Sequence, residues 1–442
     1  MKEEQLMVKL FLYQLDLFHQ VLQQIILYHG KHLPDAFTPS NELWGEMIKA
    51  HNIPIELTKT RVAGNVTGLV MKKSKYNEFI QKYGEVTIPN LIKACSVREL
   101  SMAYTNPFAS STGLNFIITT LTSIDPQNPL SESAIKGFEE FQASEPLMAY
   151  TTIQMRDSVV SKSSQDVMVL EYQSFVNTQG LQDYEFIPFG VRHDSPMYAI
   201  GNLSEEKKEL LNLFNEYCAN TKSQQLATQY GFNGMESYVS QVPKVSGSTI
   251  MQAQKLWKEK KNSNIEIAAV FIADISGSMS GAPLNNLKIS LINSAQYINQ
   301  ENLVGLISYN NKVYINLPIA KFDLRQQQLF AGAIRSLSAS GQTATFDAIV
   351  VAADMLMKVK KDNPNMKPMI FVLSDGETNV GYDLDKNLTN VIEGLGIPIY
   401  TIGYNANLTE LQKISTINEA ASINADSDDV IYALKNLFNA QM

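Results

Sequence analysis

The sequence predicts an α/β protein whose C-terminal part is built around a doubly wound, mainly parallel sheet. Three observations indicate this class. From residue 265 onward, short apolar runs alternate with longer amphipathic stretches, which is the pattern of strand–helix units. Aspartates stand at the ends of two of the apolar runs, at Asp274 and Asp375. A polar loop at 338–343 ends on a further oxygen-bearing side chain, Thr343.

The elements of this part follow from the alternation. The run at 265–273 is apolar almost throughout and is long enough for one buried parallel strand. Strands are expected near 265–273, 303–309, 313–319, 368–374 and 397–403. Helices are expected near 283–298, 324–337, 345–361, 384–394, 408–417 and 428–438. Pro, Gly and Ser accumulate just before this region, so we place a linker and connecting helix at 246–262 and the C-terminal domain at 263–442.

The turn after the first of these strands carries Asp274, Ser276 and Ser278. Side chains at i, i+2 and i+4 of an extended segment point the same way, so these three can face one point. Strand ends of a doubly wound sheet converge on one crevice, which brings Thr343 and Asp375 to the same place. Two carboxylates and three hydroxyls suit Mg²⁺ or Mn²⁺. The alternative is an ordinary Ser-Gly-Ser turn preceded by an aspartate that caps a helix.

These residues resemble the metal-ion-dependent adhesion site of von Willebrand factor A domains. Its Asp-x-Ser-x-Ser motif is matched by Asp274, Ser276 and Ser278, its loop threonine by Thr343, and its late aspartate by Asp375. Family loops often read Gly-Gly-Thr, whereas a glutamine precedes the threonine here. The resemblance implies that the five side chains hold Mg²⁺. An ion bound by neutral hydroxyls keeps much of its charge and attracts a carboxylate from a protein partner.

Composition and charge exclude several classes of function. At roughly 150 residues per domain, 442 residues correspond to about three globular units. The net charge of −8 argues against binding to nucleic acid. Cys95 and Cys218 are the only cysteines, and their wide spacing builds neither a zinc motif nor a disulfide framework. There is no nucleophile–histidine pair and no P-loop, so we expect a protein that is not an enzyme and rank a metal-dependent hydrolase last.

The first half of the chain, residues 33–245, mixes strands and helices. Strands are expected at 100–104 and 184–188, helices at 114–121 and 203–218, and 166–172 is either a strand or the start of a helix. The helix at 203–218 has Ser204 as a candidate N-cap. Two aromatic residues, Tyr104 and Tyr172, either line a cleft or, as is more usual, pack in the core.

A hydroxyl-rich loop, Ser110, Ser111 and Thr112, precedes the helix expected at 114–121. The free N–H groups at a helix N-terminus bind anions and carboxylates. In the alternative interpretation, one of the hydroxyls simply caps the helix. Glu171 either contacts a ligand or pairs with a lysine. The sequence leaves both pairs of alternatives open.

This loop, together with the segments at 171–172, 187–190 and 225–232, resembles a two-lobed bacterial solute-binding domain of the type II periplasmic-binding-protein class. Such a domain followed by a von Willebrand factor A domain is a known bacterial arrangement, and the resemblance covers residues 33–442. It implies that Ser110, Ser111, Thr112 and Glu171 bind a small solute. It also implies a location in the cell envelope, outside the cytoplasm.

The opening segment, residues 1–32, departs from that resemblance. It does not match the anchor or signal, first strand and first helix of the related domains, so we expect the first lobe to be truncated at its start. Residues 6–28 are apolar but interrupted by charged and amide side chains, which makes them a poor membrane span without a signal-peptide pattern. An amphipathic or buried helix is the better interpretation. The location of the protein is therefore left open.

Two functions remain for the whole chain. The first is a metal-dependent, adhesion-type protein-binding module attached to a solute-binding-like domain. The second is a solute receptor that uses its C-terminal domain for docking. A partner lost on removal of Mg²⁺ would favour the first, and a small molecule bound by residues 1–245 would favour the second.

Overall fold

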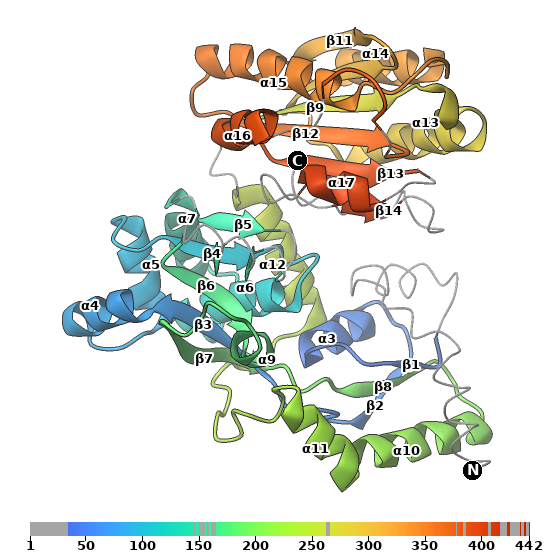
Figure 1. Ribbon diagram of the computed structural model, residues 1–442. Coiled ribbons are helices and arrows are strands. Elements are labelled where there is room, and N and C mark those ends of the chain that lie inside the picture. Colours follow the sequence, from blue (N-terminus) through green and yellow to red (C-terminus); the bar gives the residue numbers. More distant parts are fainter. Residues whose placement is uncertain are drawn as a thin grey trace.

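The computed structural model describes residues 34–144, 146–149, 152, 155–156, 159–160, 165–261, 266–376, 378–382, 386–404, 408–415, 422–424, 434, 437–438 and 442. The segment 1–32 and the helix expected at 6–28 lie outside the described residues. The chain forms two parts, with the elements of the first half on one side and those of the C-terminal domain on the other (Figure 1). No helix among the described residues is both long enough and apolar enough to cross a membrane.

The C-terminal domain contains a six-stranded sheet in the order β11-β10-β9-β12-β13-β14. Its strands are β9 (Ile267–Asp274), β10 (Leu303–Tyr309), β11 (Val313–Lys321), β12 (Lys367–Ser374), β13 (Ile399–Gly403) and β14 (Ser422–Asn424). All neighbours are parallel except the β10–β11 hairpin. The five predicted strands are confirmed, with ends that differ by at most two residues. The sequence did not predict β14, which is only three residues long.

Helices cover both faces of this sheet, as a doubly wound arrangement requires (Figure 1). They are α13 (Ala282–Ser294), α14 (Leu324–Ser336), α15 (Thr345–Asp362), α16 (Lys386–Leu395) and α17 (Leu408–Ser415). Side chains alternate along the fully buried strand β9, so Phe271 packs with α13 and α14 while Val270 packs with α15 and α16. Phe271 also stacks on Phe371 of β12 with ring centroids 4.8 Å apart. The mixed α/β prediction with a Rossmann-like C-terminal sheet is confirmed.

The first half contains two sheets. A small antiparallel sheet has the order β1-β8-β2, with β1 (Ala36–Phe37), β2 (Ile55–Lys59) and β8 (Met197–Ile200). A five-stranded sheet has the order β5-β4-β6-β3-β7, with β3 (Val66–Lys72), β4 (Met102–Thr105), β5 (Leu147–Ala149), β6 (Val167–Glu171) and β7 (Tyr184–Arg192). The chain passes between the sheets through 60–65 and again through 193–196. The ambiguous segment 166–172 is a strand, β6, which leads directly into the short helix α9 (Tyr172–Val176).

The remaining helices surround the two sheets. They are α3 (Glu42–Ala50), α4 (Lys73–Tyr83), α5 (Ile88–Ser96), α6 (Ser111–Ile124), α7 (Glu132–Ala143), α10 (Glu205–Ala219), α11 (Thr221–Gln229) and α12 (Gly247–Lys260). The predicted cap of α10 is confirmed, because the Ser204 hydroxyl accepts the N–H of Lys207. Helix α6 is buried on all sides from Ser111 to Thr122, although its sequence mixes apolar residues with serines, threonines and an asparagine.

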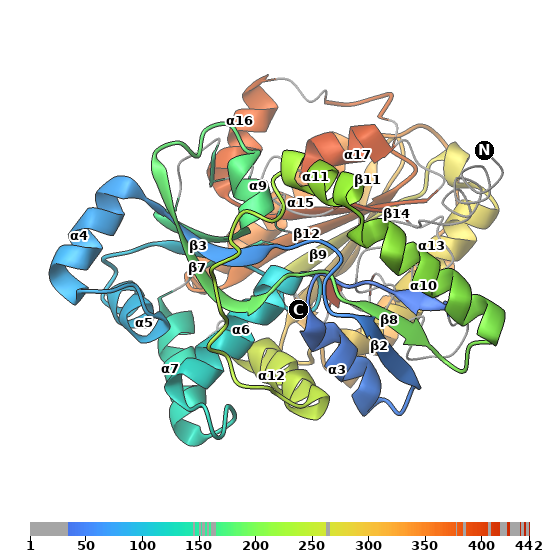
Figure 2. The same ribbon diagram turned by 90° about the horizontal axis from the view of Figure 1, so that it is seen from below.

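Helix α12, which we expected to connect the two parts, also packs into the core of the first half. It contacts α3, α6 and α7, and Figure 2 shows it beside α3 and α7. Ile250, Ala253 and Trp257 lie in the same apolar cluster as the buried residues of α3 and α6. The indole Nε1 of Trp257 donates to the Tyr104 hydroxyl at 2.8 Å. Tyr104 is therefore a core residue, and the packing of the first half extends to the end of α12.

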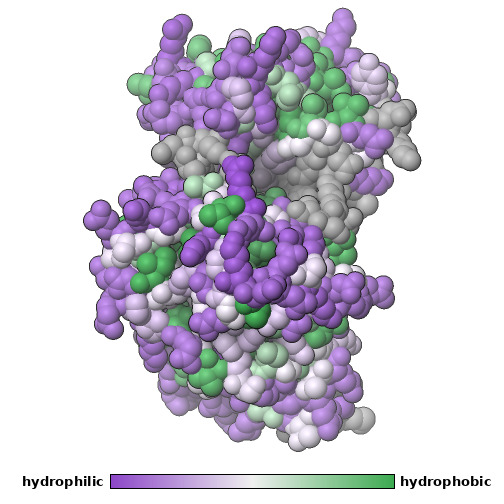
Figure 3. Space-filling view, turned by 90° about the vertical axis from the view of Figure 1, so that its left-hand side faces the viewer, coloured by the Kyte–Doolittle hydropathy of each residue, from purple (hydrophilic) through white to green (hydrophobic). Residues whose placement is uncertain are grey.

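The surface shown in Figure 3 is mainly hydrophilic, and its apolar residues occur in separate groups over both parts of the molecule. Scattered apolar side chains of this kind are normal on protein surfaces. The buried polar clusters therefore carry more information about function than this face does.

Candidate functional site

The predicted metal-binding side chains lie where the order of the C-terminal sheet reverses. In the sheet, β9 lies between β10 and β12. The chain runs from β9 to β10 on one side and later returns to β12 on the other side. Leu373 of β12 is in register with Ala273 of β9, so the carboxyl ends of the two strands finish together. Asp274 is the last residue of β9, and Asp375 follows the last residue of β12. Ligands of open α/β sheets bind in the crevice at such a position.

The carboxylate of Asp274 is fully buried and held by three donors. Its Oδ1 accepts the N–H of Ser276 at 2.8 Å. Its Oδ2 accepts the hydroxyl of Tyr309 at 3.1 Å and the hydroxyl of Ser374 at 2.6 Å. Burial raises the pKa of Asp274, the hydrogen bonds from Ser276 and Ser374 lower it, and the negative charge of Asp375 raises it again. The charges of Asp274 and Asp375 are therefore close enough to interact.

The two serines of the motif face the same side of the turn, as their spacing predicts. Their Oγ atoms are 3.0 Å apart. Ser276 is buried, whereas Ser278 is exposed and reachable from solvent. The capping alternative for Asp274 is wrong for the helix that follows, since α13 begins after Gly281 and has no side-chain cap.

The loop that carries Thr343 is tied to both neighbouring segments. The N–H of Gly277 donates to the carbonyl of Gly341 at 2.9 Å, which joins this loop to the turn after β9. The N–H of Thr343 donates to Oδ1 of Asn379 at 2.9 Å, and the N–H of Asn379 donates back to the Thr343 carbonyl at 3.0 Å. Thr343 itself is buried. The structure therefore brings together the three segments that the sequence analysis singled out.

The carboxylate of Asp375 differs from that of Asp274 because one of its oxygens is unpaired. Oδ1 of Asp375 is buried and has no hydrogen-bond partner among the residues that the structure describes. Leaving a buried acceptor unpaired costs about 1–3 kcal/mol, and more when the group is charged. A cation at this point would remove that cost. The donor set of two carboxylates and three hydroxyls fits Mg²⁺ and Mn²⁺.

Within the described ranges, no group of three or more His, Cys, Asp and Glu side chains could hold a metal ion. A site made of two carboxylates and neutral hydroxyls does not depend on such a group. The sequence analysis did miss Tyr309 and Ser374, the two donors to Asp274 Oδ2. The only signal available was that each is the last residue of a strand adjacent to β9.

The fold is that of a doubly wound α/β domain, with two aspartates and three hydroxyl side chains in the segments that meet at its switch point. Residues 269–440 match the family model of the von Willebrand factor type A domain. The C-terminal part of the chain is therefore a von Willebrand factor A domain, which confirms that part of the sequence-based prediction.

The curated relatives are much longer than the region they share with this chain. Inter-alpha-trypsin inhibitor heavy chain H3 of Bos taurus is 26% identical over 176 residues, which cover 36% of this chain and 19% of the relative. The voltage-dependent calcium channel subunit alpha-2/delta-2 of Homo sapiens is 24% identical over 157 residues, which cover 34% of this chain and 13% of the relative. The chain thus spans less than a fifth of the length of these proteins.

Solved structures also resemble a part of this chain. A von Willebrand factor type A protein from Catenulispora acidiphila is 18% identical with a TM-score of 0.34, and the match covers 40% of this chain and 41% of that one. The protein BatB from Bacteroides thetaiotaomicron is 16% identical with a TM-score of 0.33, and the match covers 39% of this chain and 96% of that one.

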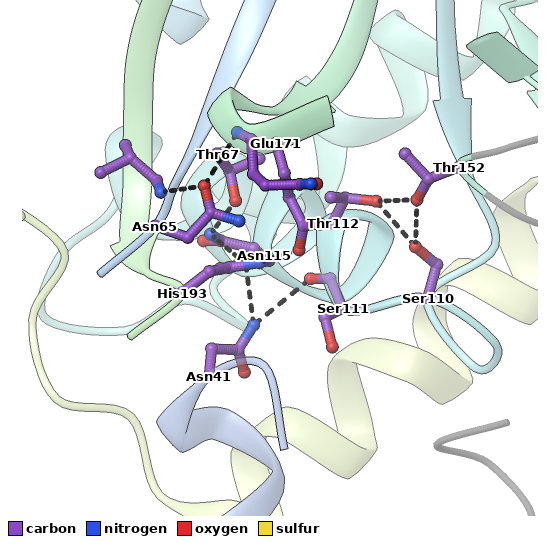
Figure 4. A network of polar contacts seen from close by, with 12 residues as sticks. Asn41, Asn65, Thr67, Ser110, Ser111, Thr112, Asn115, Thr152, Glu171 and His193 are labelled. Atoms are coloured by element: carbon purple, nitrogen blue, oxygen red, sulfur yellow. Dashed lines mark hydrogen bonds and ion pairs between the residues drawn. The ribbon is translucent and has the colours of Figure 1, made fainter. Parts of the chain in front are cut away.

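In the first half, the hydroxyls of Ser110, Thr112 and Thr152 bond to one another (Figure 4). The two oxygens are 2.7 Å apart. The hydroxyl of Thr152 lies 3.2 Å from that of Ser110 and 3.0 Å from that of Thr112, and the hydroxyl of Thr105 lies 2.9 Å from both. Ser110 is the N-cap residue of α6, but its side chain makes no capping hydrogen bond. The simple capping interpretation is therefore wrong for Ser110.

Glu171 belongs to a second group of polar contacts, centred on His193 (Figure 4). Glu171 Oε1 lies 2.6 Å from His193 Nδ1, so its partner is a histidine rather than a lysine. Nδ2 of Asn41 and Nδ2 of Asn115 lie 3.0 and 3.1 Å from His193 Nε2. Both amides are oriented by backbone N–H groups that donate to their Oδ1 atoms, from Leu43 and Val191. Nε2 of His193 therefore accepts, and Nδ1 carries the proton and donates to Glu171.

Proposed function

We propose that the C-terminal domain is a non-enzymatic, Mg²⁺- or Mn²⁺-dependent module that binds a protein partner through an acidic side chain of that partner. The observation that carries the proposal is the buried, unpaired Oδ1 of Asp375 beside the buried carboxylate of Asp274. A divalent cation neutralises such a pair, whereas nothing else among their described contacts supplies positive charge. Membership of the von Willebrand factor type A family supports the same conclusion.

Five side chains would hold the ion: Asp274, Ser276, Ser278, Thr343 and Asp375. The bound ion supplies a Lewis-acidic position for a carboxylate. Ser278 is exposed, so the site opens to solvent on the side where a partner would approach. Asp274 is fixed by its three donors, and the threonine loop is fixed by Asn379, so the chain holds its oxygens in place before the ion arrives.

The test has two stages. The full chain is first titrated with Mg²⁺ by calorimetry, with Asp375→Asn as the variant and Asp354→Asn, an exposed carboxylate of α15, as the matched control. The immobilised chain is then incubated with cell-envelope extract in Mg²⁺ or EDTA, beside Ser278→Ala. We expect a partner that is retained only by the wild type and the control in Mg²⁺. A partner that is retained equally in EDTA would contradict the proposal.

The second candidate is a solute receptor whose first half captures a small molecule at Ser110, Ser111, Thr112 and Glu171. The polar contacts weigh against strong binding at these residues, because their hydroxyl and carboxylate oxygens already have protein partners. A solute would have to replace hydrogen bonds that the protein makes with itself.

A further inference from the structure

The tip of the β10–β11 hairpin is hydrogen-bonded to the loop that carries Thr343. The N–H of Gln342 donates to Oδ1 of Asn311 at 2.9 Å, and Nδ2 of Asn311 donates back to Oε1 of Gln342 at 2.9 Å. The N–H of Ala344 donates to the carbonyl of Asn310 at 3.0 Å. The hairpin therefore holds the residues directly before and after Thr343.

The contact depends on a glycine next to it in the loop. Gly341 has a φ of +84°, and a Cβ atom at this residue would lie 2.2 Å from Oδ1 of Asn311. The carbonyl of Gly341 accepts the N–H of Gly277, in the turn that carries Ser276 and Ser278. The loop thus passes closely between the hairpin tip and the serine turn, and Asn311 fits there because residue 341 has no side chain.

The same hairpin also contacts the segment of Asp274. Tyr309, the last residue of β10, is in register with Asp274 and donates its hydroxyl to Oδ2 of that residue at 3.1 Å. The N–H of Ile275 donates to the carbonyl of Tyr309 at 2.9 Å. One hairpin therefore bonds to both the aspartate segment and the threonine segment, and it reaches the second through Asn311 and Gln342.

Asn311 and Gln342 are both exposed. Substitutions of exposed side chains usually change the stability of a protein very little. A hydrogen-bonded pair at the surface can still restrict the loop to which it belongs. A site whose ligands are held in place beforehand loses less conformational freedom when the ion binds. The effect of the Asn311–Gln342 pair should therefore appear in ion binding rather than in unfolding.

We propose that Asn311 and Gln342 are positioning residues that hold Thr343 in place at the metal site. The proposal rests on the metal site described under Proposed function, but it concerns how the threonine is held rather than whether an ion is bound. Neither side chain would touch the ion. A loop that reads Gly-Gly-Thr lacks the side-chain oxygen that accepts from Asn311, so the pair is a consequence of the glutamine that stands before Thr343 in this chain.

The experiment measures Mg²⁺ affinity and loop exchange in the full chain. Wild type, Asn311→Ala, Gln342→Ala and the double variant are titrated with MgCl₂ by calorimetry. Hydrogen exchange followed by mass spectrometry measures the peptide that covers residues 338–344, in EDTA and in saturating Mg²⁺. Asn293→Ala is the matched control, since Asn293 is an exposed amide in the last turn of α13. Thermal unfolding in EDTA shows whether each variant is folded.

We expect Asn311→Ala to weaken Mg²⁺ binding by roughly three- to tenfold, which is the factor that one or two hydrogen bonds of ordinary net strength supply. Gln342→Ala should have a smaller effect, because the N–H of residue 342 keeps Asn311 as its acceptor. The double variant should match Asn311→Ala, since the two side chains act as a unit. In EDTA the loop peptide should exchange faster in the variants than in the wild type and the control, and saturating Mg²⁺ should remove this difference.

Folded variants that keep the wild-type Mg²⁺ affinity overturn the inference and leave the metal site standing. Variants whose melting temperature in EDTA falls together with their Mg²⁺ affinity, and whose loop exchange Mg²⁺ does not restore, also overturn it, because the pair is then a general structural contact. A wild type that binds no Mg²⁺ overturns both the inference and the metal site. Should Asn311→Ala fail to fold, Gln342→Ala decides.

Discussion

The indole Nε1 of Trp44, on helix α3, lies 2.6 Å from the hydroxyl of Ser111 at the start of helix α6 and donates a hydrogen bond to it. Both residues are buried. Helix α3 contacts the small sheet through β2, whereas α6 packs on β4, β6 and β7 of the larger one. The contact therefore joins the two sheet systems of the first half through the hydroxyl-rich loop for which the resemblance implied a solute.

The first prediction concerns solute binding. The full chain should bind small anions, amino acids and sugars weakly or not at all, because Ser111 is bonded to Trp44, Ser110 to Thr112 and Glu171 to His193. Closure of two lobes over a ligand requires ligand groups that are free to change partners. Calorimetric titration measures this directly, and a solute bound with micromolar affinity would show the prediction to be wrong.

The second prediction concerns Asn115, which is fully buried and central to the same contacts. Asn115→Ala leaves the N–H and carbonyl of Val191 without their side-chain partner and removes the bond to His193. We expect a loss of roughly 2–4 kcal/mol in the free energy of unfolding, since each buried unpaired group costs about 1–3 kcal/mol.

The two tryptophans allow unfolding of the first half to be measured selectively. Trp44 and Trp257 are the only tryptophans of the chain, and both lie in the core of the first half. Urea unfolding followed by tryptophan fluorescence therefore reports on that half. Asn212→Ala, an exposed amide of α10, is the control and should change stability by less than about 0.5 kcal/mol. Equal effects of the two substitutions would argue against a structural role for the contacts of Asn115.

The sequence was most informative where a charged side chain stands at the end of an apolar strand. Asp274 and Asp375 could be placed because each closes an apolar run, and the fold brings such positions together. Tyr309 and Ser374 could not be assigned, because their role depends on which strand lies next to which. The packing of α12 was missed for a related reason. An amphipathic pattern shows that a helix has an apolar face, but it does not show which core that face contacts.

The third prediction follows from that packing. A first-half fragment that ends at residue 261 should unfold cooperatively, whereas one that ends at 245 should not. The shorter fragment lacks Ile250, Ala253 and Trp257 from the core and exposes the surfaces of α3 and α6 that they cover. Circular dichroism during urea unfolding measures the cooperativity of both fragments. Equal cooperativity in the two would show that α12 is only a connection.

The fourth prediction is that the C-terminal domain folds by itself. Residues 263–442 contain the complete alternation of strands and helices, and its two apolar clusters are formed almost wholly within the domain. We expect this fragment to show one cooperative calorimetric transition. A transition that appears only in the full chain would mean that the domain needs the first half.

The last prediction concerns Asp375→Asn, whose effect on the stability of the domain should change sign between a solution without divalent cations and one with Mg²⁺. Without a divalent cation, Asp375→Asn should leave the domain as stable as the wild type or more stable. The substitution removes a negative charge that opposes ionisation of the buried Asp274, and it replaces a buried carboxylate oxygen that lacks a partner.

With saturating Mg²⁺, the wild type should be more stable than Asp375→Asn. An ion at one hundred times its dissociation constant stabilises the folded state by about 2.7 kcal/mol, and the variant should lose most of this gain because it lacks one of the two carboxylates. Differential scanning calorimetry of fragment 263–442 in EDTA and in Mg²⁺ measures both signs, with Asp354→Asn as the control that should follow the wild type. Should Asp375→Asn and the wild type gain equally from Mg²⁺, the ion binds elsewhere. Should the variant be less stable than the wild type even in EDTA, Asp375 has a structural partner, and its unpaired oxygen does not indicate a metal site.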